Sequence, residues 1–290
     1  MEPLVSVIIC SYNEAKYIQK CIDSLLLQSY KNLELIILDD GSTDDTKEIV
    51  QEYKDPRICY VPQERHCGMI GKLRNHAVGF AKGDYLFLTD ADCITPSNWI
   101  QTGITAFENY HAKAIEGKII YYQSGYKPAL SDRVTENIHG GQWMTANMAF
   151  RKEVFSKYSF NVNYAVDEDR ELALRVSKEF QIPFISSFIV FHQKKKLNVR
   201  GLIHDRDVSL IEYKIKLISE LGDDVGNKFR ILNPRYFCML LFPPLIVAEC
   251  MRRSVRSIQD LRLLPFVWIK ALIMRYRIWK YAFKHRVFVI

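Results

Sequence analysis

The sequence lacks several patterns that would assign it to a common protein class. No stretch approaches the roughly 20 uninterrupted apolar residues of a membrane-spanning helix, so an integral protein with several spans is not expected. The seven cysteines form no C-x-x-C pair, which argues against a zinc site or a disulfide framework and favours a reducing, cytosolic compartment. We also expect no export, because Glu2 precedes only a short apolar run at residues 4–9.

Glycine-rich phosphate-binding loops are missing as well. A dinucleotide-dependent oxidoreductase needs G-x-G-x-x-G after its first strand, whereas this chain has C-S-Y-N-E-A at residues 10–15. A nucleotidyltransferase would be expected to carry a Gly-rich basic loop at the same place. Both classes of nucleotide-binding enzyme are therefore disfavoured.

The regular patterns that are present predict an α/β protein. The 290 residues are 48% hydrophobic, enough to bury one large core or two ordinary ones. Short β-branched runs alternate with helical periods over the first hundred residues. Strands are predicted at 5–9, 33–38, 58–61 and 85–88, and helices at 15–27, 46–53 and 70–81. This order predicts a doubly wound, mostly parallel sheet, with ligands beyond the carboxyl ends of its strands.

The remainder of the chain is organised differently. Strands are predicted at 115–123, 145–150 and 182–191, and an amphipathic helix at 167–180. From Leu202 onward the strand patterns fade and long helical periods dominate. We therefore expect an α/β domain over residues 1–200, followed by a helical region over residues 201–290.

The positive charge of the chain is concentrated near its C-terminus. Lys and Arg number 40 against 33 Asp and Glu, which gives a net charge of +7. Residues 251–290 hold ten basic residues and one acid, a net +9, so residues 1–250 carry a net −2. The surplus therefore belongs to the helical region and not to the α/β domain.

Acidic clusters follow three of the predicted elements. Asp39 and Asp40 directly follow the second strand, Asp90 and Asp92 follow the fourth strand as D-A-D, and Glu168–Asp169 opens the helix predicted at 167–180, after an irregular segment. Carboxylates at such spacing can hold a hard divalent cation such as Mn²⁺ or Mg²⁺. For any single pair the alternative is a solvated loop acid or a helix cap, but all three clusters together favour a ligand site.

Five longer segments identify a family resemblance. They are VSVIICSYNEAKYIQKCIDSLLLQSY, LELIILDDGSTDDT, RNHAVGFAKGDYLFLTDAD, ANMAFRKEVF and DEDRELALRV. Together they resemble an inverting family-two glycosyltransferase with the GT-A fold, over residues 4 to about 192. The resemblance implies a nucleotide-binding half at 1–95 and an acceptor half at 96–200, and it does not extend over residues 200–290.

The resemblance also implies a role for individual residues on the donor side. Tyr12 would stack on the nucleobase and Asp40 would hydrogen-bond it, with UDP the expected nucleotide. Other residues implied to contact the nucleotide are Ser11, Asn13, Glu14, and Lys72 or Arg74, of which Arg74 matches the family pattern better. Asp90 would touch the ribose, and Asp92, with Asp90 and His192, would hold Mn²⁺ or Mg²⁺ at the diphosphate.

Several of these residues have simpler alternatives. A lone histidine such as His192 is often structural, and Lys194–Lys196 is either a loop that closes over the diphosphate or a solvated charge run. Asn147 is placed among the donor-binding residues. Trp143, close to it, is either a sugar-stacking residue or part of the core.

The chemistry implied by the resemblance requires a base. Asp169 would take the proton of an acceptor hydroxyl, with Glu168 as its neighbour or an acceptor ligand, and in-line attack on the sugar would invert its anomeric centre. A helix-capping role is the alternative for this pair. A non-catalytic nucleotide-sugar-binding or scaffold protein that retains the fold is the alternative for the whole chain.

The basic C-terminal region favours an anionic membrane surface. The apolar runs 236–248 and 263–274 are too short to span, but aromatic residues interleave with Lys and Arg as in an interfacial helix. These aromatic residues are Trp268, Tyr276, Trp279, Tyr281 and Phe283. Nucleic acid is disfavoured because the region is rich in aliphatic residues, while a packed subdomain or a homodimer face is the alternative. We therefore expect a peripheral protein on the cytoplasmic side of the membrane, with a lipid-linked or cell-envelope glycan as acceptor.

Overall fold

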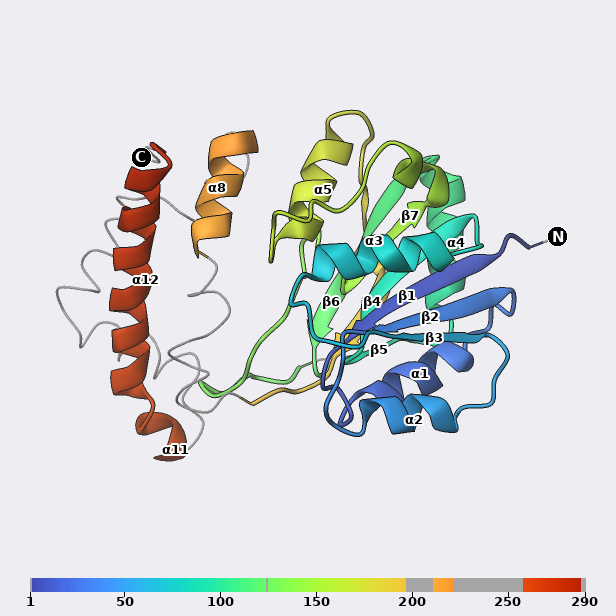
Figure 1. The fold of residues 1–290 in the computed structure, drawn as a ribbon, viewed down its shortest axis with the longest axis horizontal. Coiled ribbons are helices and arrows are strands. Elements are labelled where there is room, and N and C mark those ends of the chain that lie inside the picture. Colours follow the sequence, from blue (N-terminus) through green and yellow to red (C-terminus); the bar gives the residue numbers. More distant parts are fainter. Residues whose placement is uncertain (1, 124, 197–210, 222–257, 288–290) are drawn as a thin grey trace. The chain divides into compact units, whose positions relative to one another are not determined.

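The computed structural model describes residues 2–123, 125–196, 211–221 and 258–287. The chain divides into two units, one formed by residues 1–124 and 135–193 and the other by residues 125–134 and 194–290. The first unit contains an eight-stranded sheet in the order β3-β2-β1-β4-β7-β6-β8-β5 (Figure 1). Its strands are β1 (Val5–Ser11), β2 (Leu33–Asp39), β3 (Ile58–Pro62), β4 (Tyr85–Asp90), β5 (Cys93–Ile94), β6 (Ala114–Tyr121), β7 (Asn147–Arg151) and β8 (Phe184–His192).

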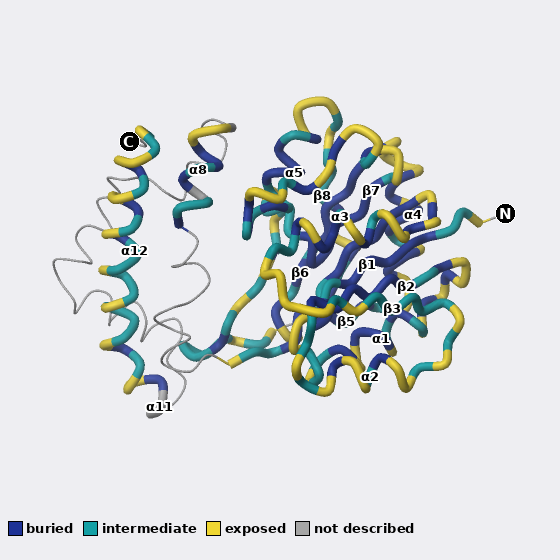
Figure 2. Tube along the Cα trace, viewed as in Figure 1, coloured by how far each residue is buried: buried dark blue, intermediate teal, exposed yellow. Residues whose placement is uncertain are grey.

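The first four strands are parallel, as the sequence predicts. β1 pairs with β2 and with β4, and β2 pairs with β3. The crossover helices are α1 (Ile18–Leu26), α2 (Thr46–Glu52) and α3 (Ile70–Phe80). Nearly every residue of β1 and β2 is buried (Figure 2), because helices cover both faces of a parallel sheet and leave neither face to water. All four predicted strands and three predicted helices are confirmed, with ends that differ by a few residues.

The core forms two clusters on opposite faces of this sheet. Val5, Val7 and Ile9 of β1 belong to the first cluster and Ile8 to the second, as expected when successive side chains of a strand point to opposite faces. α1 and the helix α4 (Trp99–Tyr110) contribute to the first cluster, and α3 and the helix α5 (Glu168–Ser177) to the second.

The second half of the sheet is mixed. β7 is antiparallel to both β4 and β6, β8 is parallel to β6, and the two-residue β5 is antiparallel to β8. The three predicted strands and the helix at 167–180 are confirmed here. Three elements have no counterpart in the predictions above, namely α4, β5 and the 3-10 helix η1 (Lys152–Ser156).

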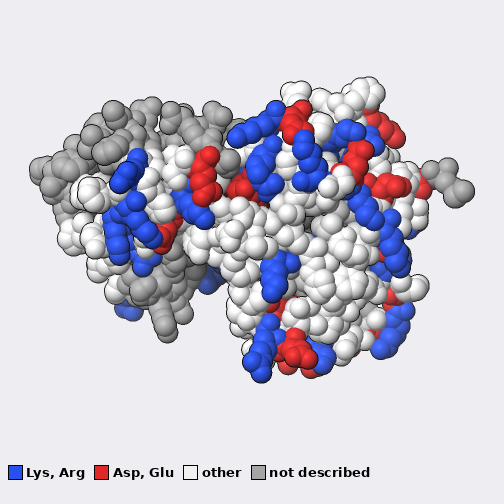
Figure 3. Space-filling model, turned by 45° about the horizontal axis from the view of Figure 1, so that its top comes forward, with Lys and Arg blue, Asp and Glu red and all other residues white. Residues whose placement is uncertain are grey.

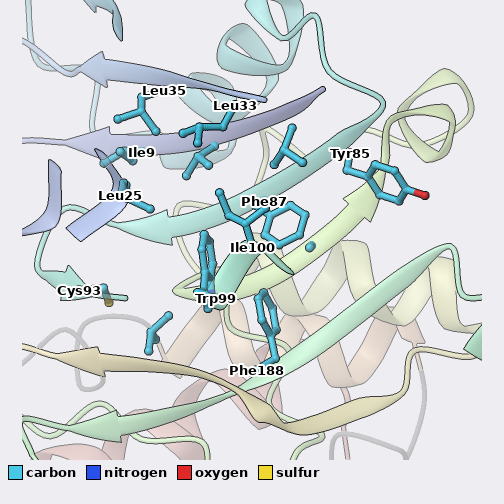
Figure 4. Packing of buried hydrophobic residues seen from close by; sticks show 14 of the residues in the cluster. Ile9, Leu25, Leu33, Leu35, Tyr85, Phe87, Cys93, Trp99, Ile100 and Phe188 are labelled. Atoms are coloured by element: carbon cyan, nitrogen blue, oxygen red, sulfur yellow. The ribbon is translucent and has the colours of Figure 1, made fainter. Parts of the chain in front are cut away.

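A glycine allows α4 to approach the sheet closely. Gly103 lies in the middle of the helix, where a Cβ would come within 2.5 Å of the Phe87 ring. Phe87 is fully buried and makes edge contacts with Trp99 and Phe188 (Figure 4). Gly103 weakens the helix, but the close packing of α4 on the sheet requires it. This long-range contact is not visible in the local sequence pattern.

The described part of the second unit contains helices, as predicted. They are α8 (Ile211–Leu221), α11 (Ile258–Leu261) and α12 (Leu264–Lys284). Ile211 and Ile215 of α8 pack with Ile278 and Ala282 of α12. Among these helices and the others that the structure describes, none combines the length and the apolar character needed to cross a membrane. The apolar run at 236–248 lies outside the described residues.

Charge is mixed over the α/β unit. On the face shown in Figure 3, Lys and Arg side chains lie among Asp and Glu side chains. Residues 1–124 and 135–193 hold 18 basic and 24 acidic residues, a net −6. Several of these charges form exposed ion pairs, such as Lys157 with Glu179 and Lys113 with Glu153. The bulk charge of this unit therefore gives no preference for an anionic macromolecule.

Packing at Gly103 can be tested by adding one methyl group. We expect Gly103→Ala to lower the free energy of unfolding by about 1–3 kcal/mol, because the new Cβ overlaps a ring that is held on several sides. The matched control is Gly79→Ala in α3, where a Cβ meets nothing within 4 Å and a better helix former replaces glycine. Urea denaturation of both variants measures the difference; equal midpoints would contradict the packing argument.

Candidate active site

The carboxyl ends of the parallel strands bring the predicted donor-side residues together. In the sheet register, Ser11 of β1 lies beside Asp39 of β2, and Cys10 lies beside Asp90 of β4. The loops that follow β1, β2 and β4 therefore start at the same edge. This is the edge at which open α/β sheets bind their ligands.

Asp90, Asp92 and His192 form a cluster that can hold a metal ion. One ligand atom of each lies within 4.8 Å of the others, and Asp92 and His192 are both buried. Sheet pairing creates this arrangement, because β5 places Cys93 opposite His192 and the Gln193 amide donates to the Asp92 carbonyl at 2.7 Å. Asp92 and His192 are 100 residues apart in sequence, and the pairing of the two-residue strand β5 with β8 brings them together.

The orientation of the His192 ring fits a cation. Its Nδ1 lies 3.0 Å from the Gln193 carbonyl oxygen, which can only accept, so Nδ1 carries the proton. Nε2 then faces the Asp92 carboxylate at 3.2 Å. A lone pair facing a carboxylate is unfavourable unless a cation or a second proton stands between them. Two carboxylates and one imidazole suit Mn²⁺ or a similar divalent ion.

The loop after β1 is tied to the loop after β2. Asn13 has a left-handed backbone, with φ of 54°, and its Oδ1 accepts from the Thr43 amide at 2.8 Å. The Glu14 amide donates to Thr46 Oγ1 at 2.9 Å. Both residues thus hold these loops together, while Ser11 is buried and Tyr12 is exposed at the edge of the site.

Asp40 binds the loop that precedes α3. Its carboxylate accepts hydrogen bonds from the amides of Cys67 at 2.9 Å and Gly68 at 3.2 Å. His66 Nδ1 is 2.6 Å from Asp40 Oδ2, and the His66 ring stacks on Tyr12. His66 is absent from the residues predicted by sequence, because a single histidine in a polar loop carries no motif.

Arg74 connects the two acidic clusters. It is buried on α3, forms an ion pair with Glu168 of α5 and lies 3.7 Å from Asp90 of β4. Burial on its own would lower the pKa of Arg74, but the facing Glu168 and, to a lesser degree, Asp169 and Asp90 raise it. Arg74 therefore remains a cation between the predicted metal and base residues, whereas Lys72, the other candidate, is exposed.

Asp169 is held by the loop before β7. Its Oδ2 accepts from the amide of Thr145 at 3.1 Å and from Thr145 Oγ1 at 3.2 Å. Asp167 precedes α5 and makes no side-chain cap bond, whereas Glu168 and Asp169 lie in the first turn of the helix, where carboxylates suit its dipole. Asp169 Oδ1 also accepts from the Arg170 amide at 2.8 Å, so the helix-terminus alternative stands beside the predicted base role. Thr145, like His66, was not predicted; it is an ordinary hydroxyl residue whose importance depends on a contact across 24 residues of sequence.

Asn147 is a correction to the predicted site. It is fully buried, its Oδ1 accepts from Trp99 Nε1 at 2.9 Å, and its Nδ2 donates to the carbonyls of Lys118 and Phe188 at 2.9 and 2.8 Å. These bonds use the oxygen and both amide hydrogens. The side chain is thus fully engaged in joining α4 to β6 and β8, which argues against the predicted ligand contact.

Two other candidates are engaged in the protein itself. Trp143 is half-buried and packs against the second core cluster. Its amide donates to Glu116, a buried carboxylate that also accepts from the amides of Gly141 and Gln142. In the second unit, Lys194 lies over the Tyr126 ring and Lys196 pairs with Asp132 at 2.7 Å, so these lysines are not simply solvated.

Comparison with known proteins decides the family. The family model described as Glycosyl transferase family 2 matches residues 6–163, more than half of the chain. The chain belongs to this family. An uncharacterized glycosyltransferase of Methanocaldococcus jannaschii is 38% identical over 263 residues, 85% of this chain and 88% of the relative.

A second relative has a more specific name. It is UDP-Glc:alpha-D-GlcNAc-diphosphoundecaprenol beta-1,3-glucosyltransferase WfaP of Escherichia coli, 38% identical over 123 residues, which are 42% of this glycosyltransferase and 46% of WfaP. For most of the curated relatives the match spans less than two thirds of their own length.

Solved structures confirm the predicted GT-A fold of this glycosyltransferase. Residues 1–349 of S. aureus TarS in complex with UDP-GlcNAc match with a TM-score of 0.59 and 18% identity, over 97% of this chain and 91% of that TarS fragment. The mannosyltransferase PcManGT from Pyrobaculum calidifontis, in complex with GDP-Man and Mn²⁺, matches with a TM-score of 0.54 and 16% identity, over 98% of this chain and 76% of PcManGT.

The Arg74 ion pair gives a stability prediction for this glycosyltransferase. We expect Arg74→Met to lower the free energy of unfolding by about 3–5 kcal/mol, because a buried Glu168 carboxylate loses its cation. Adding Glu168→Gln to this variant is expected to restore part of the loss, since the uncompensated charge disappears with it. Urea denaturation of both variants measures these changes.

The control for this prediction is an exposed pair. Lys157 and Glu179 form an ion pair with side chains 62% and 41% exposed, and water screens such pairs. We therefore expect no resolvable change for Lys157→Met. A loss as large as that of Arg74→Met would show that the cost arises from removing any basic residue.

Proposed function

We propose that the protein transfers a hexose from a nucleoside diphosphate sugar to an acceptor hydroxyl, with inversion at the anomeric carbon. The observation that carries the proposal is the chain of contacts through Arg74, which joins the cation-binding cluster around Asp90 to the Glu168–Asp169 pair. A donor-binding group and a base on one rigid scaffold are what such a displacement requires.

UDP is the proposed nucleotide of the donor. The name of WfaP includes UDP-Glc and the TarS structure contains UDP-GlcNAc, while PcManGT contains GDP-Man. In our proposal Tyr12 and Asp40 bind the base, and Ser11, Asn13 and Glu14 shape the loop beside it. Asp90 and Asp92, with His192, hold Mn²⁺ or Mg²⁺, which when bound neutralises charge on the diphosphate.

Asp169 is the proposed general base. The two donors of Thr145 hold its carboxylate in place. The acceptor hydroxyl gives its proton to Asp169 while its oxygen bonds to the anomeric carbon. The bond between that carbon and the diphosphate oxygen breaks on the opposite side, which releases the nucleoside diphosphate and inverts the centre. Arg74, a buried cation next to Asp90, adds positive charge on the donor side.

A lipid-linked or cell-envelope glycan is the proposed acceptor, reached from the cytoplasmic face of the membrane. The printed name of WfaP describes an acceptor on diphosphoundecaprenol. The exposed face of α12 supports attachment to a membrane surface. Ile269, Leu272, Tyr276, Trp279 and Phe283 follow one another at steps of three or four residues and are between 37% and 86% exposed.

This apolar stripe of α12 is flanked by cations. Lys280 is exposed beside it, Lys284 is exposed but pairs with Glu212 of α8, and Arg277 is half-buried. Tyr281, which the sequence placed among the membrane-facing aromatics, packs instead with the cluster formed by α8 and α12. An apolar stripe next to basic side chains is typical of helices that lie in the interface of an anionic leaflet.

Two substitutions separate the proposed catalytic roles. We expect Asp169→Asn to reduce kcat by about 10²–10⁴-fold, because the base is lost, while UDP still binds in the presence of Mn²⁺. Asp92→Asn is expected to remove the Mn²⁺ dependence of UDP binding, because the cation cluster loses a ligand. Isothermal titration and a product assay with UDP-sugars measure both.

The same measurements distinguish a glycosyltransferase from the alternative, a non-catalytic scaffold protein. Unchanged turnover of Asp169→Asn would refute the base assignment. No turnover by the unmodified protein with any nucleotide sugar, together with intact Mn²⁺-dependent UDP binding, would favour the scaffold. Proton NMR of the product reports the anomeric configuration, and retention would contradict the proposed displacement.

Membrane attachment can be tested on the α12 stripe. We expect the full-length protein to float with liposomes rich in phosphatidylglycerol, and Trp279→Glu/Phe283→Glu to reduce the bound fraction at least several-fold, because charged residues then face the acyl region. Tyr110→Glu is the matched control, since this residue of α4 is 61% exposed in the α/β unit. Equal binding of the stripe variant and the control would contradict the proposal.

A homodimer is the competing use of the same face. If the stripe joined two copies of the chain, the double variant would change the mass measured by light scattering without lipid, and the unmodified protein would not float. Neutral phosphatidylcholine liposomes separate the apolar contribution from the charge, which is screened by salt.

A further inference from the structure

The side chain of His66 stacks on Tyr12, one of the two residues proposed to bind the base. Its imidazole lies over the ring of Tyr12 with 3.7 Å between the ring centroids and 17° between the planes. This is the stacking distance of two aromatic rings in contact. No second planar ring fits between them in this arrangement, so this face of Tyr12 is covered by the protein itself.

The edge of the same imidazole contacts Asp40. Nδ1 lies 2.6 Å from Asp40 Oδ2, and the Asp40 side chain is only 4% exposed. A ring N–H that donates to a buried carboxylate is a charge-assisted hydrogen bond. Uracil presents the same combination, a flat aromatic ring with an N–H in its plane. His66 thus makes both of the contacts that Tyr12 and Asp40 are proposed to make with the base.

The backbone around His66 is held, but its side chain is not enclosed. The next two amides, of Cys67 and Gly68, donate to Asp40. A Cβ on Gly41 would lie only 2.8 Å from the backbone of Arg65 and His66, which shows how closely the two loops approach. The His66 side chain is nevertheless 44% exposed. Rotation of the side chain can therefore clear Tyr12 while the loop keeps its hydrogen bonds.

We propose that His66 is an internal substitute for the nucleobase, which the incoming donor must displace from Tyr12 and Asp40. The inference rests on the proposed function, since it takes the base to bind at these two residues. His66 is then a residue that sets affinity. It gives the Asp40 carboxylate a donor in addition to the Cys67 and Gly68 amides when no nucleotide is bound, and the contacts that must be broken weaken nucleotide binding. It also favours bases that can replace both contacts.

The test compares UDP binding by His66 variants. We expect His66→Ala to bind UDP about tenfold more tightly in the presence of Mn²⁺, because the base no longer displaces a stacked and hydrogen-bonded ring. Binding of pyrophosphate with Mn²⁺, a probe that has no base, is expected to stay unchanged. His76→Ala, an exposed histidine of α3, is the control for loss of an imidazole. Titration calorimetry measures each of these affinities, and thermal melts confirm that each variant is folded.

Two further variants separate the contacts of His66. His66→Phe keeps a ring for Tyr12 but no donor for Asp40, and His66→Asn keeps a donor but no ring. Both are expected to bind UDP with affinities between those of the unmodified protein and His66→Ala. If one of these two variants binds UDP as tightly as His66→Ala and the other binds it like the unmodified protein, the effect belongs to one contact, which would overturn the claim that His66 makes both.

The remaining outcomes separate this inference from the proposed function. Weaker UDP binding by His66→Ala would mean that His66 contacts the base directly, and unchanged binding would mean that the base does not use this face of Tyr12. Either result overturns the proposal that His66 takes the place of the base, and leaves the proposed nucleotide site intact. If neither the unmodified protein nor His66→Ala binds UDP or GDP, both the inference and the proposed function are wrong.

Discussion

The arrangement of this site depends on one buried guanidinium. Arg74 reaches from α3 to Glu168 on α5 and to Asp90 at the end of β4, and its charged group also lies over the Phe160 ring, 5.6 Å from its centre. A single cation facing more than one acid in a dry environment is stabilised only when those acids stay in place. The same charge therefore fixes the spacing of three elements and adds to the positive potential that a departing diphosphate would meet.

Local patterns account for the parallel half of the fold but only for part of the site. β1 and β2 consist mostly of buried apolar residues, and α1 has an apolar stripe at helical spacing. These patterns lie within each element, so the elements were predictable. The acids at the strand ends could be located because strand ends share an edge. α4 escaped prediction because its central glycine is explained only by the Phe87 ring beneath it.

Contacts made by backbone and by common residues were the unpredictable part of the site. Thr145 positions Asp169, and His66 covers Tyr12. Neither residue type carries a motif, and each contact joins segments that are far apart in sequence. Asn147 shows the converse error. From the sequence it is placed among the donor-binding residues, yet its side chain accepts from Trp99 and donates to two backbone carbonyls of β6 and β8. Whether a polar residue near the site can contact a ligand therefore depends on whether its side chain points toward the site or into the core.

The pairing of β5 with β8 sets a minimum length for a working enzyme. The family match ends at residue 163, whereas the last ligand of the cation cluster is His192 and the proposed base is Asp169. A fragment cut at the boundary of the family match would keep the nucleotide loops and lose both the base and one metal ligand. During synthesis, the donor-binding loops leave the ribosome before the proposed base and the last residue of the cation cluster, so a chain that ends near residue 163 has loops for a nucleotide but no proposed base.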